Sequence, residues 1–157
     1  MITKEKDLEK KLAVIDIGSN SVRLKICSFE SEKKYRVLVE EKDTIRLGEE
    51  VFEKGFFGPN SVEKALNTLK KFKSVIDKYD VDYSRAVATA GFRESANQQE
   101  LVHHIYQELG LPIEVISGAE EGHLIALGVI SNFHLEGKTA LIVDIGGGSA
   151  EIITCNE

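Results

Sequence analysis

Two stretches of the chain follow one pattern and decide the fold: AVIDIGSNSVRLKI (residues 13–26) and LIVDIGGGSAEIIT (residues 141–154). With Asp16 placed on Asp144, an offset of 128 residues, the copies share Asp, Ile, Gly and Ser. Each copy is an apolar strand that ends in an Asp, then a glycine-containing turn with Ser, then a second strand. The repeat predicts two equivalent β-hairpins, one near each end of the chain.

The turns of these hairpins suit the binding of a phosphate chain. The sequence contains no GxxxxGK[ST] motif, and no helix follows either turn directly, as a dinucleotide-binding GxGxxG would require. Glycines allow consecutive backbone N–H groups to point inward as an anion-binding nest, and the strand-end Asp can hold Mg²⁺ through water. Ordinary tight turns, which Gly and Asp also form, remain the alternative.

The remaining pattern alternates strands and helices after an antiparallel start. Strands are predicted at residues 12–17, 22–27, 35–39, 85–90, 113–116, 139–145 and 150–154, the first and sixth of them buried on both faces. Helices are predicted from capping boxes at Asn60/Glu63 and Ser117/Glu120, and from Asn97 to Leu109. The order βββαβαβα, followed by a new ββ, predicts an α/β fold with a mixed five-stranded sheet and helices on its faces.

Composition narrows the class of protein. The chain has 157 residues, 42% of them hydrophobic, and a net charge of −6, which argues against a nucleic-acid-binding surface. Cys27 and Cys155 lack metal-ligand spacing and indicate reduced thiols, hence a cytoplasmic location. The N-terminus has no apolar leader and no stretch of about eighteen apolar residues occurs, so we expect no membrane partner.

Four motifs in order carry a resemblance to a known family: DIGSNSVRL (16–24), TAGFRES (89–95), ISGAEEGHLI (116–125) and DIGGGSAE (144–151). Along essentially the whole chain, the sequence resembles the exopolyphosphatase and guanosine pentaphosphate phosphohydrolase family, Ppx/GppA, of the actin-like superfamily. The resemblance implies a phosphohydrolase dependent on Mg²⁺ or Mn²⁺ that removes the terminal phosphate of polyphosphate or of pppGpp.

The resemblance also implies a role for individual residues. Glu121 matches the catalytic glutamate that orients and deprotonates the attacking water. Asp144 matches the metal-binding aspartate, with Asp16 and Glu151 as further acidic residues for the metal. The residues implied to contact substrate phosphate are Ser19, Asn20, Arg93, Gly146, Gly147, Gly148 and Ser149. One departure is that Gly122-His123 follows the paired glutamates, where the family often has Ala-Arg.

The resemblance further implies how the chain divides. Residues 1–135 would be the first, ribonuclease-H-like lobe, and residues 136–157 the first hairpin of a second lobe whose remainder is absent. We therefore expect this chain alone to be inactive, and its exposed hairpin to favour a homodimer.

Other interpretations remain open from the residues. Glu121 also suits the first turn of a helix through the macrodipole, and Arg93 also suits a salt bridge with Glu94 or another acid. An actin-like nucleotide- or phosphate-binding regulatory or assembly module, or a kinase of the same superfamily, would contain the same hairpins. Binding of ADP would favour these alternatives, and release of orthophosphate would favour the hydrolase.

Overall fold

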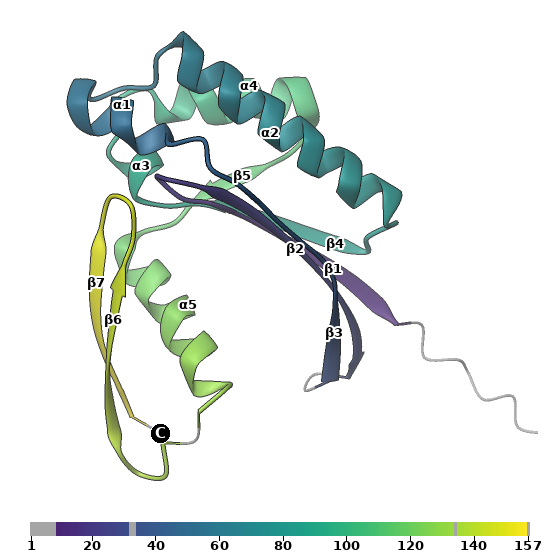
Figure 1. Cartoon of the computed structure of the whole chain (residues 1–157), viewed down its shortest axis with the longest axis vertical. Helices are drawn as coiled ribbons and strands as arrows, with labels where there is room; N and C mark the ends of the chain where they lie inside the picture. Colours follow the sequence, from purple (N-terminus) through teal and green to yellow (C-terminus); the bar gives the residue numbers. More distant parts are fainter. Residues whose placement is uncertain (1–8, 32–33, 134, 157) are drawn as a thin grey trace, which may run out of the picture.

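The computed structural model describes residues 9–31, 34–133 and 135–156, and it contains the mixed five-stranded sheet that the sequence predicts (Figure 1). The strand order is β3-β2-β1-β4-β5. The strands are β1 (Lys10–Ile17), β2 (Val22–Ser31), β3 (Lys34–Asp43), β4 (Tyr83–Ala88) and β5 (Ile113–Val115). β1 pairs antiparallel with β2 and parallel with β4, so it is central in the sheet, as its apolar run predicts.

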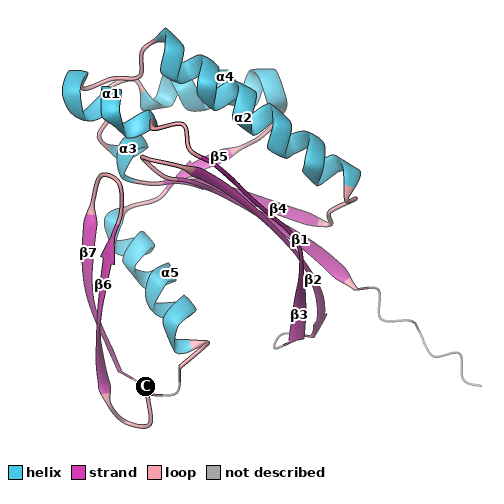
Figure 2. Ribbon diagram, in the orientation of Figure 1, coloured by secondary structure: helices cyan, strands magenta, loops and turns pink. Residues whose placement is uncertain are grey.

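The helices are α1 (Leu47–Lys54), α2 (Pro59–Lys78), α3 (Ala90–Arg93), α4 (Gln98–Leu109) and α5 (Gly118–Ile130). Figure 2 shows α1, α2 and α4 on one face of the sheet. Phe72 of α2 and Ile105 of α4 pack in one buried cluster with Ile15 of β1 and Leu24 of β2. This core fixes the β1–β2 turn, which carries the first of the two repeated motifs.

The opposite face of the sheet is less covered than the sequence predicts. Ala13, Ile15 and Ile17 of β1 are buried, but Val14 between them is 46% exposed. The prediction that this strand is buried on both faces is therefore wrong, because α5 turns away from the sheet and packs against β7 (Ala150–Asn156). A Cβ on Gly122 of α5 would lie 3.3 Å from the side chain of Ile153.

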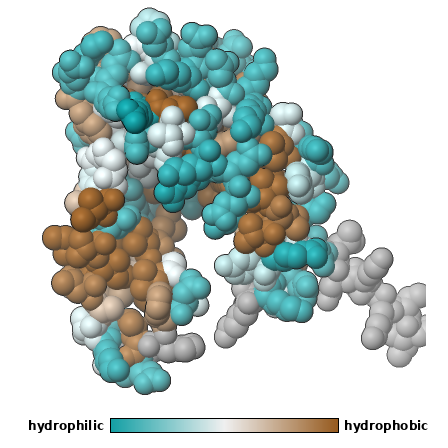
Figure 3. Space-filling view, in the orientation of Figure 1, coloured by the Kyte–Doolittle hydropathy of each residue, from teal (hydrophilic) through white to brown (hydrophobic). Residues whose placement is uncertain are grey.

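The second repeated motif forms a separate two-stranded sheet of β6 (Thr139–Ile145) and β7. The sequence predicts a buried strand at 139–145, but Leu141, Val143 and Ile145 of β6 are exposed. Figure 3 shows apolar surface over this hairpin and α5. Within the described residues, only α5 packs closely along the hairpin. No helix of the described part is long and apolar enough to span a bilayer.

The start of α2 is capped from outside its own sequence. The helix begins at Pro59, not at a box of Asn60 and Glu63, and its N-cap residue Gly58 has no side chain to offer. The Glu50 carboxylate of α1 accepts the Ser61 hydroxyl at 2.6 Å and the Gly58 N–H at 2.9 Å. Glu50 thus joins α1 to α2 and replaces the missing cap.

These contacts predict a pH dependence of stability. The hydrogen bonds from Ser61, Gly58 and Lys54 lower the pKa of Glu50 to about 2, against roughly 4.3 for an unfolded chain. Because the folded pKa is depressed, the stabilisation is present above pH 4 and is lost as the pH falls towards 2. Urea unfolding between pH 6 and pH 3 measures this loss of stability. In the Glu50→Gln variant, which has no carboxylate to protonate at this position, we expect this part of the pH dependence to be absent. Glu53→Gln, on the same helix and exposed, is the control and keeps the wild-type pH dependence.

Candidate active site

The first hairpin turn, residues 18–21, is held by α1. The Gly18 N–H donates to the Ser21 carbonyl at 3.1 Å and closes the turn. The Ser19 carbonyl accepts from the Gly48 N–H at 2.7 Å, and Ser19 is buried. The turn is therefore fixed by backbone contacts at the end of β1, where Asp16 lies.

The second turn, residues 146–149, repeats this geometry. The Gly146 N–H donates to the Ser149 carbonyl at 2.9 Å, the same bond as in the first turn at the same offset of 128 residues. In both turns the two central N–H groups, those of Ser19 and Asn20 and those of Gly147 and Gly148, have no acceptor among the described residues. Each turn therefore offers two adjacent free donors, the arrangement of an anion-binding nest.

The two turns are in direct contact. A Cβ on Gly147 would lie 2.8 Å from the Asn20 Cβ and 3.2 Å from the Asn20 backbone nitrogen. A Cβ on Gly148 would lie 2.7 Å from the Ser19 Oγ and would also overlap the Phe52 ring of α1. A side chain would not fit at either position, so this close packing explains Gly147 and Gly148 of the second motif, but not Gly146.

Between the turns lies a cavity of about 190 Å³, which we call the hairpin cavity. It brings together most of the residues that the sequence predicts for the site: Asp16, Ser19, Asn20, Glu121, Asp144, Gly146, Gly147, Gly148 and Ser149. Pockets for drug-sized ligands measure roughly 300–1,000 Å³, so this cavity holds only part of a long substrate.

Among the other residues that line the hairpin cavity, Arg23 and Thr89 have polar side chains that the sequence analysis did not assign to the site. Arg23 lies opposite Asp16 in the register of β1 and β2, and Thr89 follows β4 at the same edge of the sheet. The only sequence signal for Arg23 is its place inside the DIGSNSVRL motif. Its position beside the cavity depends on how β1 and β2 pair, which the motif alone does not show.

The carboxylates of the hairpin cavity are electrostatically coupled. Burial raises the pKa of Asp16, the nearby Arg23 lowers it, and the negative charge of Asp144 raises it again. Two facing carboxylates that repel one another are stabilised by a cation between them. Among the described residues, no three His, Cys, Asp or Glu side chains gather into a complete metal-binding group. The donor set fits Mg²⁺, which commonly takes one or two carboxylates and completes its shell with water and phosphate.

Glu121 stands in the first turn of α5, and its position is set by the helix cap. The Ser117 hydroxyl accepts the Glu120 N–H at 3.1 Å, which confirms the Ser117 half of the predicted capping box. The Glu120 carboxylate pairs with Arg85 instead of with the Ser117 N–H. The Glu121 carboxylate accepts Arg93 Nη1 at 2.7 Å, and both side chains are largely buried, at 16% and 20% exposure. The Ile116 carbonyl accepts the same nitrogen at 3.1 Å.

Arg93 and Glu151 lie apart from the other predicted residues. Arg93 does not line the hairpin cavity; it lines a neighbouring groove and is paired with Glu121, not with Glu94. Glu151 is opposite Asp144 in the β6–β7 register and lines a pocket against α5. The phosphate contact of Arg93 and the metal contact of Glu151 stay predictions.

The sheet order and the paired hairpins define an α/β protein of the actin-like class. The model of the Ppx/GppA phosphatase family matches residues 26–157, and the chain belongs to this family. This confirms the resemblance that the four motifs carry.

Solved structures agree in fold and sequence. An exopolyphosphatase from Cytophaga hutchinsonii is 37% identical with a TM-score of 0.89, and the Aquifex aeolicus family member is 35% identical with a TM-score of 0.83. Each match covers 94% of this chain and 47% of the solved chain. A bifunctional 3-dehydroquinate synthase/phosphatase from Fusobacterium nucleatum is 34% identical over 151 residues, 92% of this chain and 23% of that protein. The chain thus spans about half the length of these solved relatives and about a quarter of the length of the bifunctional protein.

Proposed function

We propose that this chain is the N-terminal part of a hydrolase that releases the terminal phosphate of inorganic polyphosphate, of pppGpp, or of both. One observation carries the proposal. Two equivalent turns, each with two N–H donors that lack an acceptor among the described residues, contact one another and line one cavity with Glu121, Asp16 and Asp144. We further propose that residues 1–135 are the first lobe and that residues 136–157 begin the second.

Hydrolysis of a phosphoanhydride needs a positioned water, a base, and donors over the developing charge, with little covalent chemistry from the protein. The N–H groups of Ser19, Asn20, Gly147 and Gly148 would bind the oxygens of the terminal phosphate. Glu121 would orient the attacking water and accept its proton at a carboxylate oxygen. Arg93 holds the Glu121 carboxylate in place in this structure.

A divalent cation, Mg²⁺ or Mn²⁺, completes the proposal. Asp144 and Asp16 would hold it, and when bound it would supply positive charge to the phosphate oxygens. Asp144 follows the apolar run of β6, and Asp16 occupies the equivalent place on β1.

The metal proposal predicts the effect of Asp144→Ala. We expect this variant to raise the metal concentration needed for half-maximal activity at least about tenfold. Removing a residue that only hydrogen-bonds a metal ligand already weakens metal binding about 10- to 100-fold. Activity of the complete protein, titrated with Mg²⁺ after EDTA treatment, measures the change. Glu151→Ala is the matched comparison, and we expect a smaller rise because its carboxylate lies outside the hairpin cavity. Full activity in EDTA would refute the metal requirement.

The function itself is tested by phosphate release. The complete protein is incubated with polyphosphate and with pppGpp in parallel, and orthophosphate is measured in each. Release from either substrate supports the proposal and gives the preference. No release from either, together with binding of ADP, would favour a kinase or an assembly module. The 157-residue chain should release little, since only two strands represent the second lobe and catalysis needs positions held within fractions of an ångström.

A further inference from the structure

Helix α1 connects the first hairpin turn to the core of the sheet. Its residues Leu47 and Val51 are buried, at 1% and 3% exposure, and between them the Gly48 N–H donates to the Ser19 carbonyl at 2.7 Å. In a trans peptide the C=O and the N–H of one unit point in opposite directions. The Asn20 N–H, which shares a peptide unit with that carbonyl, therefore points away from α1. The helix thus sets the direction of one donor of the first turn.

One side chain of α1, that of Phe52, reaches the second turn at the tip of the β6–β7 hairpin (Figure 1). A Cβ on Gly148 would lie 2.1 Å from Cζ of the Phe52 ring and 2.4 Å from its Cε2. A Cβ on Gly48, one helical turn before Phe52 on the same face of α1, would lie 2.7 Å from the same Cε2. The edge of one ring therefore lies against the backbone of both glycines, and a side chain at either position would displace it.

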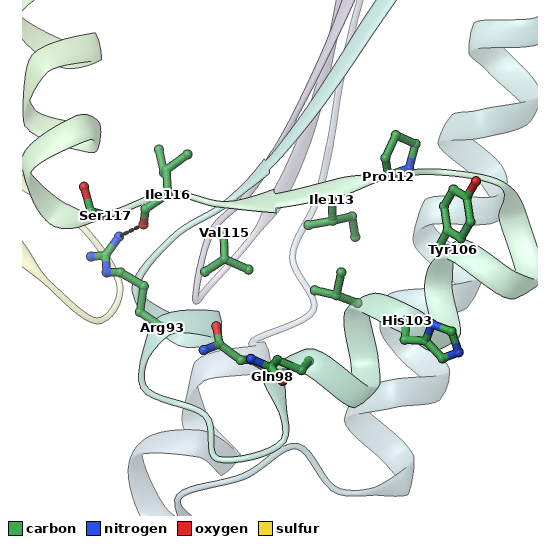
Figure 4. A pocket seen from close by; sticks show the side chains of 11 residues that line it. Arg93, Gln98, His103, Tyr106, Pro112, Ile113, Val115, Ile116 and Ser117 are labelled. Atoms are coloured by element: carbon green, nitrogen blue, oxygen red, sulfur yellow. Dashed lines mark hydrogen bonds between the residues drawn. The ribbon is translucent and has the colours of Figure 1, made fainter.

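Arg93, the other long side chain that contacts the site from this lobe, holds a different element. Its Nη1 donates to the Ile116 carbonyl at 3.1 Å (Figure 4) and to the Glu121 carboxylate at 2.7 Å. It thus positions the start of α5. At the second turn, by contrast, the two atoms nearest to a Cβ on Gly148 both belong to Phe52.

Burial in the core does not account for the position of this ring. Phe52 is 46% exposed, whereas Leu47 and Val51 of the same helix are almost fully buried. Phe52 is also absent from the residues that line the hairpin cavity, so its ring acts from outside the site. Its closest contact to the second hairpin is with the glycine backbone that carries one of the proposed phosphate donors.

We propose that Phe52 is a positioning residue for the hairpin cavity. Its ring holds the second turn against the first, so that the N–H donors of the two turns keep a fixed separation. The effect on phosphate release rests on the proposed function, whereas the contact between Phe52 and Gly148 does not.

The first test compares Phe52→Ala with Phe56→Ala in the complete protein. Phe56 follows α1 and is 44% exposed, so the two variants remove the same side chain at nearly equal exposure. Without the Phe52 ring the second turn is free to move, and we expect kcat/KM for orthophosphate release to fall at least about tenfold. Phe56→Ala should stay within about twofold of the wild type, as a surface substitution away from the site.

The second test is a double-mutant cycle on unfolding, which reports the contact without any measurement of activity. Gly148 is outside the left-handed region of the backbone, so alanine adds no backbone strain there, but its methyl group collides with the Phe52 ring. In Phe52→Ala that space is free, and only the Ser19 hydroxyl, whose oxygen would lie 2.7 Å away, has to rotate. We therefore expect Gly148→Ala to lower the urea midpoint less in Phe52→Ala than in the wild type. In Phe56→Ala it should lower the midpoint as much as in the wild type.

Coupled unfolding together with a selective loss of activity in Phe52→Ala would support the proposal. Additive effects of Phe52→Ala and Gly148→Ala on the urea midpoint would overturn the contact, and equal activities of Phe52→Ala and Phe56→Ala would overturn the positioning role. A wild-type protein that releases no phosphate would instead refute the proposed function. The unfolding cycle would then still decide whether Phe52 holds the second turn.

Discussion

Replacing Glu121 by Gln in the complete protein is expected to lower kcat at least about 100-fold, the lower end of the contribution of general-base catalysis. The amide keeps the size of the side chain and its oxygen can still accept Arg93 Nη1, but it cannot take the proton of the attacking water. Binding of the phosphate chain should remain, because the hairpin N–H donors are untouched. Steady-state release of orthophosphate and equilibrium binding of polyphosphate together separate the two effects.

Glu120→Gln is the control for this variant. Glu120 precedes Glu121 in the first turn of α5, but its carboxylate pairs with Arg85 of β4 at 3.1 Å and it does not line the hairpin cavity. We expect it to keep wild-type turnover. Unchanged turnover in Glu121→Gln would remove Glu121 from the catalytic role.

The second large effect is expected from Gly147→Ala. The new methyl group would fall 2.8 Å from the Asn20 Cβ and 3.2 Å from its backbone nitrogen, neither of which a side-chain rotation can move. The two hairpins must then separate, and a displacement of about 1 Å can lower a rate about 100-fold. We expect a loss on this scale in kcat/KM for orthophosphate release.

Two glycines serve as controls for Gly147→Ala. At Gly146 a Cβ would lie 3.4 Å from the Ser149 carbonyl oxygen, an ordinary contact, and at Gly128 of α5 nothing lies within 4 Å. Gly128→Ala should keep full activity, and Gly146→Ala should lose far less than Gly147→Ala. Equal losses at Gly146 and Gly147 would show that the contact with Asn20 is not what limits the site.

The repeated motif was sufficient to predict the hairpins and most of the residues of the candidate site. Asp16 and Asp144 are far apart in sequence, yet the same strand–Asp–Gly–Ser pattern places both at the end of an apolar strand beside a tight turn. The Ser117 cap could also be predicted, because a capping box is a local interaction between residues three apart. Structural features that depend on residues a few positions apart can be predicted from the sequence without knowing the fold.

Other features depend on contacts between distant segments. The cap of α2 comes from Glu50, so the local Asn60/Glu63 pattern gave the wrong start. Arg93 and Glu121 are 28 residues apart, and only the fold brings the Arg93 side chain at the end of α3 to the first turn of α5. Burial was also misjudged: β6 has a continuous apolar run, but within the described residues only α5 packs along its hairpin, so Ile145 is 78% exposed.

The most direct measurement is hydrolysis of polyphosphate by the complete protein in ¹⁸O-labelled water. If Glu121 activates a water between the two hairpins, each orthophosphate released carries one ¹⁸O atom from the solvent. Mass spectrometry of the orthophosphate gives the result. Absence of labelled orthophosphate, with phosphate transferred to ADP instead, would contradict the account.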